Sequence, residues 1–574
     1  IGSIAYVNIP IAREHEYLIE PILLCFLTAL SLLQIAKANP PRTITPFEVC
    51  YGAFTLYTIA NSMLLHSFDA VAAGQGIVLV VVYFSLRSTG IPKHPSIFSS
   101  VLLWIIILLF TSYVLVVLCS DAIRGKAIDT LFLPNKSIFS IYLASHIVFI
   151  LPFYHYHCKQ AYTRKTRVLR WVASLIIVLS VLLLVYTKGR AGWIGCGAAV
   201  WYLLYHYIRT SALRKKIFRY AALLVILLAP LVLWYKWDST QGRMLIYKVS
   251  TSILKDHWRC GIGMGQFKVR YNEYQATYFA GKGIDTREAL LADNTFYAFN
   301  DPYQLFIETG IIGFLCWAMA LLCLVQQVKN MKTTSDNKHV FVAAAASLIC
   351  IVTASLFSYP LQTFPILLQV TICLALVNSY HSDATNVVLP KVIAKGLKRV
   401  LLLLCSLLLI HSYILLQYKI RSHQAFELSR IGYRKKAVTF YKPLVYSYIK
   451  DGNTLYFYAR DLYHSNELEK ANLMLRKARK YFCTNEVYRL SASTAFELHN
   501  IQEAENLYKT ALYMVPNRMV SRYDLLNFYS AMKDTTNAMY WATSIVTMEV
   551  KVPSKKTFRM QQRAATMLQS LQRR

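Results

Sequence analysis

Hydrophobic residues in the first 420 positions form long runs separated by short polar segments. Each run is close to the roughly 20 residues that a helix needs to cross a bilayer, and an open sheet edge could not satisfy its backbone in lipid. The pattern therefore predicts an all-α, polytopic helical membrane protein over residues 1–419. About twelve spans are expected, at 17–36, 46–66, 68–87, 97–119, 137–157, 168–187, 191–208, 217–236, 303–328, 339–357, 360–379 and 398–417.

After residue 420 the helical period continues while hydrophobicity drops. Ala437, Ala471, Ala504 and Ala538 follow one another at intervals of 34, 33 and 34 residues, each at the start of a similar phrase. A repeated helix-turn-helix of about 34 residues is typical of the tetratricopeptide repeat, and stacked repeats form an α-solenoid. We expect residues 420–574 to be such a domain, with a surface for a protein partner; a plain helical bundle is the alternative.

The charge is strongly positive, with 62 Lys and Arg against 29 Asp and Glu. A nucleic-acid site would be one continuous basic face, whereas short basic loops orient a membrane protein with those loops in the cytoplasm. Much of the excess lies in short loops, so no nucleic acid partner is expected. These loops are 158–167, 209–216, 329–338 and 380–397.

This orientation places the long loop 237–302 and everything after residue 418 outside the cytoplasm. The same count places Ile1 outside, and the sequence does not begin with Met. We therefore expect at least one further span, or a cleaved signal segment, before Ile1.

The polar chemistry offers no obvious metal or cofactor site. The twelve cysteines are scattered, mostly inside spans, with no C-x-x-C, and indicate packing residues. No His/Cys ligand spacing and no D-x-D-type pair is found in an outer loop. Neither a metal nor a cofactor is expected.

Three basic residues lie at the predicted outer boundary. "TKGRAGWIG" places Lys188 and Arg190 at the outer end of a span, and "QGRMLIYKVS" places Arg243 just after the next outward crossing. A guanidinium holds a phosphate bidentately and stays charged. Snorkelling to lipid headgroups is the alternative, and for Lys188 the two are equally supported.

Two features of the outer loop carry expectations of their own. "CGIGMGQF", Cys260 to Phe267, has no parallel strand and crossover around it, so we interpret it as a turn near a ligand or the membrane. Phe267, Tyr271, Tyr274 and Tyr278 share one face of a helix. Such a face beside a membrane is expected at the interface; stacking on sugar rings is the alternative.

The segment "AFNDPYQLFIETGIIGF" passes from polar residues into a span. Pro302 suits the first helical turn, and the exposed N–H groups of that turn favour an anion. Gly310 and Gly313 lie one turn apart, so we expect a neighbouring helix to pack closely there.

Together these motifs resemble the O-antigen ligase family, of the same superfamily as O-antigen polymerases and bacterial protein O-oligosaccharyltransferases. The resemblance covers roughly residues 100–330, with the family signature of His-Asn, nine residues, then Gly-x-x-Gly matched by Asn300, Gly310 and Gly313. Phe299 stands where that signature has its histidine. The other matching segments are "LPNKSIFSIYLA", "KGRAGWIG" and "GRMLIYKVSTSILKDHWRCGIGMGQF".

The resemblance implies transfer of a glycan from a polyprenyl diphosphate donor, typically undecaprenyl diphosphate, to an acceptor hydroxyl. The reaction would be metal-independent and occur on the periplasmic face of the bacterial inner membrane, with the C-terminal domain in the periplasm. Lys188, Arg190 and Arg243 would bind the donor diphosphate. The acceptor would be lipid A-core, a growing glycan or a protein.

A phenylalanine at position 299 cannot take a proton from the acceptor hydroxyl, so either another group takes the role of the family histidine or a different set of residues is used. The catalytic candidates are Asp293, Asn300, Asp301 and Glu308, with His257 more remote. Asp293 is preferred as the base since its segment lies just outside the membrane. Each carboxylate has a structural alternative as a helix cap or loop hydrogen-bond acceptor.

Two other function classes stay open. A non-catalytic scaffold would use the repeat domain to recruit partners, but Arg190, Arg243 and Asn300 are retained. A transporter of the same lipid-linked glycan would need ionisable residues at mid-membrane depth, of which the spans are nearly free.

Overall fold

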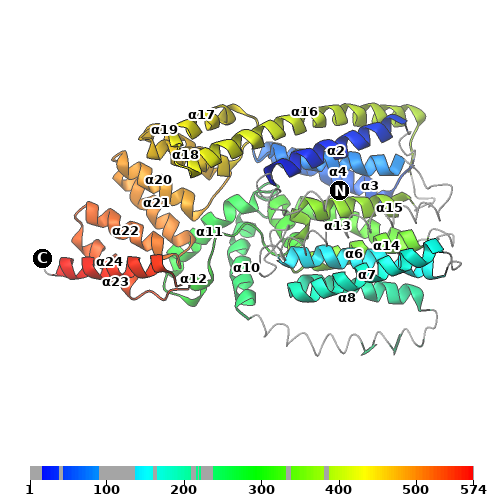
Figure 1. Cartoon of the computed structure of the whole chain (residues 1–574), viewed down its shortest axis with the longest axis horizontal. Coiled ribbons are helices and arrows are strands. Elements are labelled where there is room, and N and C mark those ends of the chain that lie inside the picture. Colours follow the sequence, from blue (N-terminus) through cyan, green and yellow to red (C-terminus); the bar gives the residue numbers. More distant parts are fainter. Residues whose placement is uncertain are drawn as a thin grey trace.

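The computed structural model describes residues 16–37, 43–88, 136–159, 164–208, 237–330, 338–379, 387–551 and 553–572, and positions 212, 215, 216, 219 and 220. This part is helical almost throughout, and the all-α fold is confirmed (Figure 1). Its two strands, β1 (Thr43–Ile44) and β2 (Val387–Val388), pair antiparallel with Thr43 opposite Val388.

Seven helices among the described residues are long and apolar enough to cross a membrane. Three further helices, α3 (Pro46–Leu64), α8 (Arg190–Tyr207) and α15 (Phe364–Ser379), lie among them (Figure 1). The expected span at 97–119 lies outside the described residues, as does the one at 217–236 apart from positions 219 and 220. The seven are α2 (Glu16–Lys37), α4 (Ala70–Ser88), α6 (Lys136–Cys158), α7 (Arg164–Thr187), α13 (Asp301–Lys329), α14 (Lys338–Ser355) and α16 (Lys391–Arg430).

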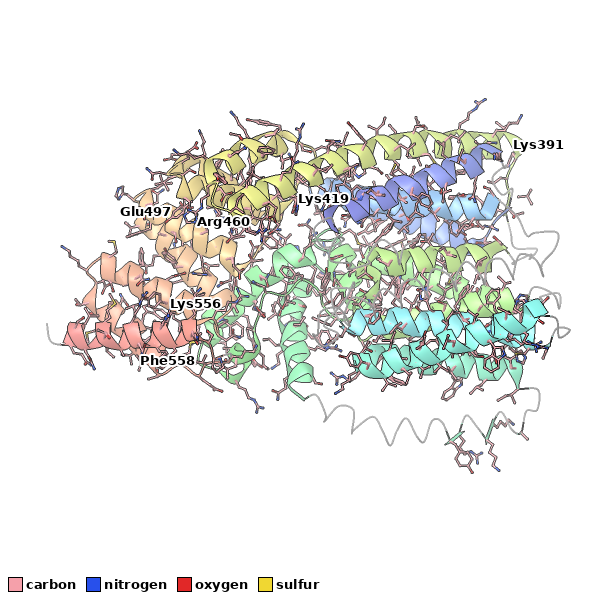
Figure 2. All side chains as sticks on the ribbon, viewed as in Figure 1. Lys391, Lys419, Arg460, Glu497, Lys556 and Phe558 are labelled. Atoms are coloured by element: carbon pink, nitrogen blue, oxygen red, sulfur yellow. The ribbon has the colours of Figure 1, made fainter. Side chains whose placement is uncertain are left out.

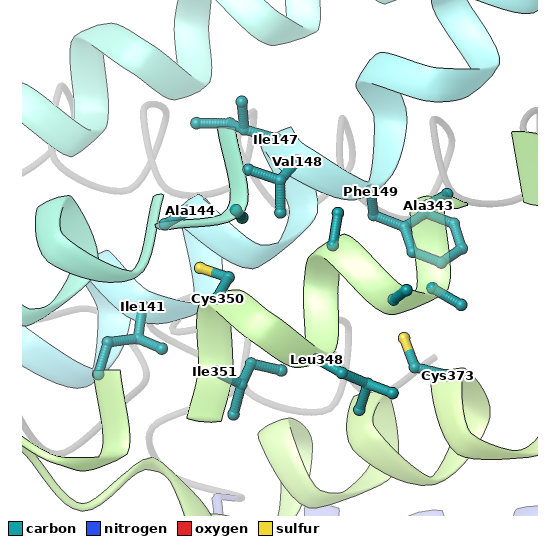
Figure 3. Close-up of a cluster of buried hydrophobic side chains, with 14 of the residues drawn as sticks. Ile141, Ala144, Ile147, Val148, Phe149, Ala343, Leu348, Cys350, Ile351 and Cys373 are labelled. Atoms are coloured by element: carbon teal, nitrogen blue, oxygen red, sulfur yellow. The ribbon is translucent and has the colours of Figure 1, made fainter. Parts of the chain in front are cut away.

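Small residues let the central helices approach closely. Ala343 to Ala346 of α14 are buried, and the Ile147–Phe149 segment of α6 lies near Ala343 (Figure 3). Gly195 of α8 lies against Cys350 of α14, since a Cβ there would come 2.5 Å from the Cys350 carbonyl oxygen. Such close contacts replace the hydrophobic effect as the source of helix association in lipid.

The turn after α3, the turn before α8 and the turn after α14 lie at the same end of the bundle. Residues 237–302 and the helices that follow α16 extend from this end as well (Figure 1). Lys391 marks the opposite end of α16, and Lys419 lies where this helix leaves the bundle (Figure 2). We call the end that carries residues 237–302 the loop end.

The loop 237–302 has a small core of its own. It contains α10 (Trp237–His257), α11 (Phe267–Lys282) and α12 (Arg287–Leu291). Phe267 and Tyr271 of α11 are fully buried and cluster with side chains of α10 and α13. The expectation that this aromatic face lies at the membrane interface is therefore wrong, because it fills the core of the loop.

Helix α16 runs unbroken for 40 residues through the expected boundary at 419/420. Helix pairs follow it, and the four alanines that define the sequence period are all fully buried. The tetratricopeptide assignment itself stays a prediction. The helices are α17 (Arg434–Tyr441), η3 (Lys442–Tyr446), α18 (Gly452–His464), α19 (Leu468–Arg479), α20 (Asn485–Glu497), α21 (Ile501–Met514), α22 (Met519–Ala531), α23 (Thr535–Val546) and α24 (Lys555–Gln572).

The turns inside these pairs repeat with the same period. Gly432, Asn466, His499 and Lys533 all have positive φ, at intervals of 34, 33 and 34 residues. In each turn the next N–H donates to a carbonyl five residues back, as Tyr433 N does to Leu428 O at 2.9 Å. This is the Schellman end of a helix, and it explains why the repeat tolerates different residues at one position.

Candidate functional site

Arg243 connects several segments at the loop end. Its guanidinium donates to the carbonyl of Phe357, after α14, at 2.9 Å and lies 5.3 Å from the centroid of the Phe299 ring. Burial lowers the pKa of Arg243. The electrostatic interaction with Tyr247 raises this pKa, and the nearby positive charge of Arg190 lowers it. The two arginines expected to bind a phosphate are thus brought close enough to repel each other.

Two helices begin beside these arginines. Arg190 is the first residue of α8, and Gly189 is its N-cap. Asn300 is the N-cap of α13, and its Oδ1 accepts from Tyr303 N at 3.0 Å. Helix N-termini present N–H groups and positive potential, so this end of the bundle favours an anion.

Phe299 has φ +56°, a conformation rare for a bulky residue. Its ring packs edge-on against Tyr359 at 5.2 Å between centroids, and Tyr359 stacks on Tyr297 at 4.1 Å. The residue that stands in place of the family histidine is thus a strained aromatic beside Arg243.

Asp301, the first residue of α13, is buried. Its Oδ2 accepts from Leu361 N at 2.8 Å. The Gln362 side chain also hydrogen-bonds this carboxyl, while no donor among the described residues has normal hydrogen-bond geometry to Oδ1. A buried polar oxygen without a partner is costly, so this atom is open to a further donor.

Glu308 has a structural position. Its Oε1 accepts from Phe267 N at 3.2 Å and from Gln304 Nε2 at 3.1 Å. The side-chain oxygen Oε1 of Gln304 in turn accepts from Ala298 N at 3.0 Å. The polar side chains near the start of α13 therefore tie the loop to the helix.

Helix α13 is broken at Gly310, with φ +66° and ψ −173°. The turn that contains Gly261 docks into the break, where Ile311 N donates to Trp258 O at 2.8 Å and Gly263 N donates to Glu308 O at 2.9 Å. A Cβ at Gly310 would overlap the backbone of Arg259. The expectation of helix packing at Gly310 is wrong, because this glycine provides a break in the helix.

The expectation is confirmed at Gly313. A Cβ there would come 2.7 Å from the Tyr57 ring of α3. The Tyr57 hydroxyl donates to Thr309 O at 2.8 Å, a carbonyl next to the break. Helix α3 therefore supports the break, and it also contacts the glycine-rich turn, where Asn61 Nδ2 donates to Cys260 O at 2.9 Å.

Comparison with known families bears directly on this arrangement. Residues 175–318 match the family model described as O-antigen ligase. The resemblance to the O-antigen ligase superfamily is confirmed. The match runs from α7 into α13 and contains Arg190, Arg243 and Asn300. No curated protein matches the chain.

The glycines beside Arg190 have a packing role in this ligase-like segment. At Gly189 and Gly192 a Cβ would overlap Ser140 of α6, so both glycines let α8 approach that helix. Lys188 is exposed, with φ +50°, at the turn before α8. Lys188 thus lies at the loop end, and the two glycines set the distance between α8 and α6.

Asp293 is an exposed residue in an ion pair. Its Oδ1 lies 3.0 Å from Arg518 Nη2 and accepts from Asn294 N at 2.8 Å. Arg518, the N-cap of α22, is also bonded to Glu486 of α20. Asp293 therefore lies at the junction between the loop and the C-terminal helices, while Asn300 and Asp301 lie at the start of α13.

The aromatic turn after α14, with Phe357 and Tyr359, is a part of the site that sequence reasoning missed. The run "FSYP" at an outer turn is the signal that could have indicated it. In the described part of the chain, no three His, Cys, Asp or Glu residues lie close enough to hold a metal ion.

Proposed function

We propose that this protein transfers a glycan from a polyprenyl diphosphate donor to an acceptor hydroxyl. The observation that carries the proposal is that Arg190 and Arg243 lie near each other inside the ligase-like segment. They lie beside the starts of α8 and α13. Two guanidiniums and the N–H groups of α8 and α13 suit a diphosphate.

In the proposed reaction the bond between the anomeric carbon and the diphosphate oxygen breaks. The acceptor oxygen bonds to that carbon and gives up its proton. Arg190 and Arg243 stabilise the negative charge that develops on the leaving diphosphate, and Lys188 adds charge at the rim. This is electrostatic stabilisation by preorganised groups, which is strong in a partly dry site.

Asp301 is the carboxylate whose surroundings best support proton transfer. Oδ2 is held by Leu361 N, which fixes the group, and Oδ1 is open. Glu308 is committed to Phe267 and Gln304, and Asp293 to Arg518. We therefore assign Asp301 as the base and Asn300 as the helix cap that positions it. Asp293 is assigned as a residue that connects the loop 237–302 to the C-terminal helices.

We place the reaction on the periplasmic face of the bacterial inner membrane, with the C-terminal helices on the same side. Support comes from the basic loops, which lie at the predicted cytoplasmic turns, and from the shared end of residues 237–302 and 420–574 (Figure 1). The acceptor is lipid A-core, a growing glycan or a protein.

The test is a complementation assay in a deletion strain, with lipopolysaccharide ladders and glycoprotein masses as readouts, which also separates the acceptors. Arg243→Ala and Arg190→Ala should abolish transfer at unchanged protein level. Arg243→Lys should also fail because lysine lacks the bidentate fork. Arg559→Ala, on exposed α24, is the control. Normal transfer by Arg243→Ala would reject the donor site and favour a scaffold.

A further inference from the structure

A cavity of about 220 Å³ lies between α16 and the first C-terminal helices, α17 to α19, and none of its lining residues belongs to the proposed transfer site. Its wall contains four tyrosines, from the end of α16, from α17 and α18, and from the segment after α19. The hydroxyl of one of these, Tyr441, is buried and makes no hydrogen bond to a described residue. The four are Tyr418, Tyr441, Tyr458 and Tyr481.

The cavity lies next to the expected end of the span within α16. Tyr418 directly follows the expected span 398–417. The hydroxyl of Tyr448, in the segment that lines the cavity, lies 2.7 Å from Nδ1 of His411 inside that span. Tyr446 is 83% exposed beside it. Tyrosines with an apolar ring and a polar tip prefer the boundary between lipid and water.

The charge around the cavity is positive. Lys450, Lys477 and Lys480 line it, and Asp451 is the acid among the lining residues. Asp451 is already used as the N-cap of α18, where it accepts from Asn453 N at 3.1 Å and from Thr454 Oγ1 at 2.7 Å. Lys477 and Lys480 are exposed and form no ion pair with a described residue.

We propose that this cavity binds the phosphate headgroup of an anionic phospholipid from the surrounding bilayer. The lysines pair with the phosphate, as basic pockets at a membrane surface do. The tyrosine rings pack on the glycerol and the first methylene groups, and the Tyr441 hydroxyl gains a partner. A soluble acidic peptide or sugar would not require the cavity to lie at the depth of His411.

The bound lipid has a mechanical consequence. Helices α17 to α19 form the cavity together with the end of α16, so a lipid there ties the first C-terminal helices to the bilayer surface. The C-terminal helices contact the loop 237–302, which holds Arg243. Lipid binding therefore fixes the orientation of the C-terminal helices and the loop 237–302 relative to the membrane surface.

The test uses the full-length protein in neutral detergent, with short-chain phosphatidylglycerol as the probe and short-chain phosphatidylcholine as the comparison. Binding is counted by native mass spectrometry. Lys477→Gln/Lys480→Gln should weaken phosphatidylglycerol binding by about tenfold or more, since one lysine near an anionic surface is worth roughly fivefold. Phosphatidylcholine binding should not change.

The matched control is Lys435→Gln/Lys436→Gln, which removes two exposed lysines of α17 that do not line the cavity. An equal loss in this control would overturn the proposal in favour of general surface charge. Equal binding of the two lipids by the unaltered protein would also overturn it. Displacement of phosphatidylglycerol by glucuronate or by an acidic peptide would assign the cavity to a soluble ligand.

Discussion

Phe299 combines backbone strain with a ring that supports Arg243. A non-glycine residue in this conformation costs on the order of 1 kcal/mol. Phe299→Gly should therefore be more stable than Phe299→Ala by about 1 kcal/mol, while both lower transfer partially because the guanidinium loses its aromatic surface. Thermal unfolding and transfer assays on the two variants test this. Equal stability would show that the surroundings relax the strain.

Asn300 is predicted to act through its cap. Asn300→Ala removes the hydrogen bond to Tyr303 N and should cost about 1 kcal/mol of stability. It should lower transfer more than Phe299→Ala does, because the start of α13 lies beside Arg243. Asn300→Ser keeps a capping oxygen and should recover both stability and transfer. Recovery of stability alone would mean that the amide itself contacts the substrate.

Asp301→Asn separates proton transfer from folding. The asparagine oxygen can still accept from Leu361 N, so the variant should fold, but it cannot take a proton. We expect transfer to fall about a hundredfold or more, as for loss of a general base. Asp293→Asn provides the comparison. Loss of transfer in Asp293→Asn at normal stability, with Asp301→Asn active, would support the preference drawn from the sequence.

At the scale of elements, the broken helix α13 depends on one glycine. Gly310→Ala places a methyl group against the Arg259 backbone in a conformation that disfavours side chains. We expect a loss of about 2 kcal/mol or more and loss of transfer, since the break supports the loop that carries Arg243. Gly197→Ala in α8, where a Cβ meets no atom within 4 Å, is the control and should be neutral or stabilising.

At the scale of the whole molecule, the C-terminal helices hold the loop in place. Asn517 donates to the carbonyls of Ala289 and Leu290, at 3.2 and 2.9 Å. Arg518 bridges Asp293 of the loop and Glu486 of α20. These contacts end only a few residues before Phe299, so we expect the position of the proposed site to depend on the C-terminal helices.

A charge exchange tests this dependence. Asp293→Arg should lower transfer because two arginines then face each other, and Arg518→Asp should do so because it faces Glu486. The double variant Asp293→Arg/Arg518→Asp restores opposite charges and should recover transfer in part. Recovery identifies a positioning pair, whereas a catalytic Asp293 would not be rescued. The same activity in all three would show that the junction does not influence the site.

The sequence by itself determined the features that neighbouring residues produce. A run of apolar residues is enough to define a span, so α2, α4, α6, α7, α13 and α14 were predicted closely, and the span within α16 was found although the full length of that helix was not. The regular spacing of the alanines from Ala437 to Ala538 indicated the helix pairs, because each pair is built from residues within one repeat. The order of Arg190, Arg243 and Asn300 was enough to indicate the ligase-like segment.

Only the tertiary structure decided what distant segments do to one another. Tyr271 is buried because α10 and α13 cover it, and Gly310 breaks its helix because the Trp258 turn bonds to the free backbone. Asp293 pairs with an arginine 225 residues away. Helical period and span length are set by contacts a few residues apart, whereas these partners depend on how packed helices bring remote residues together.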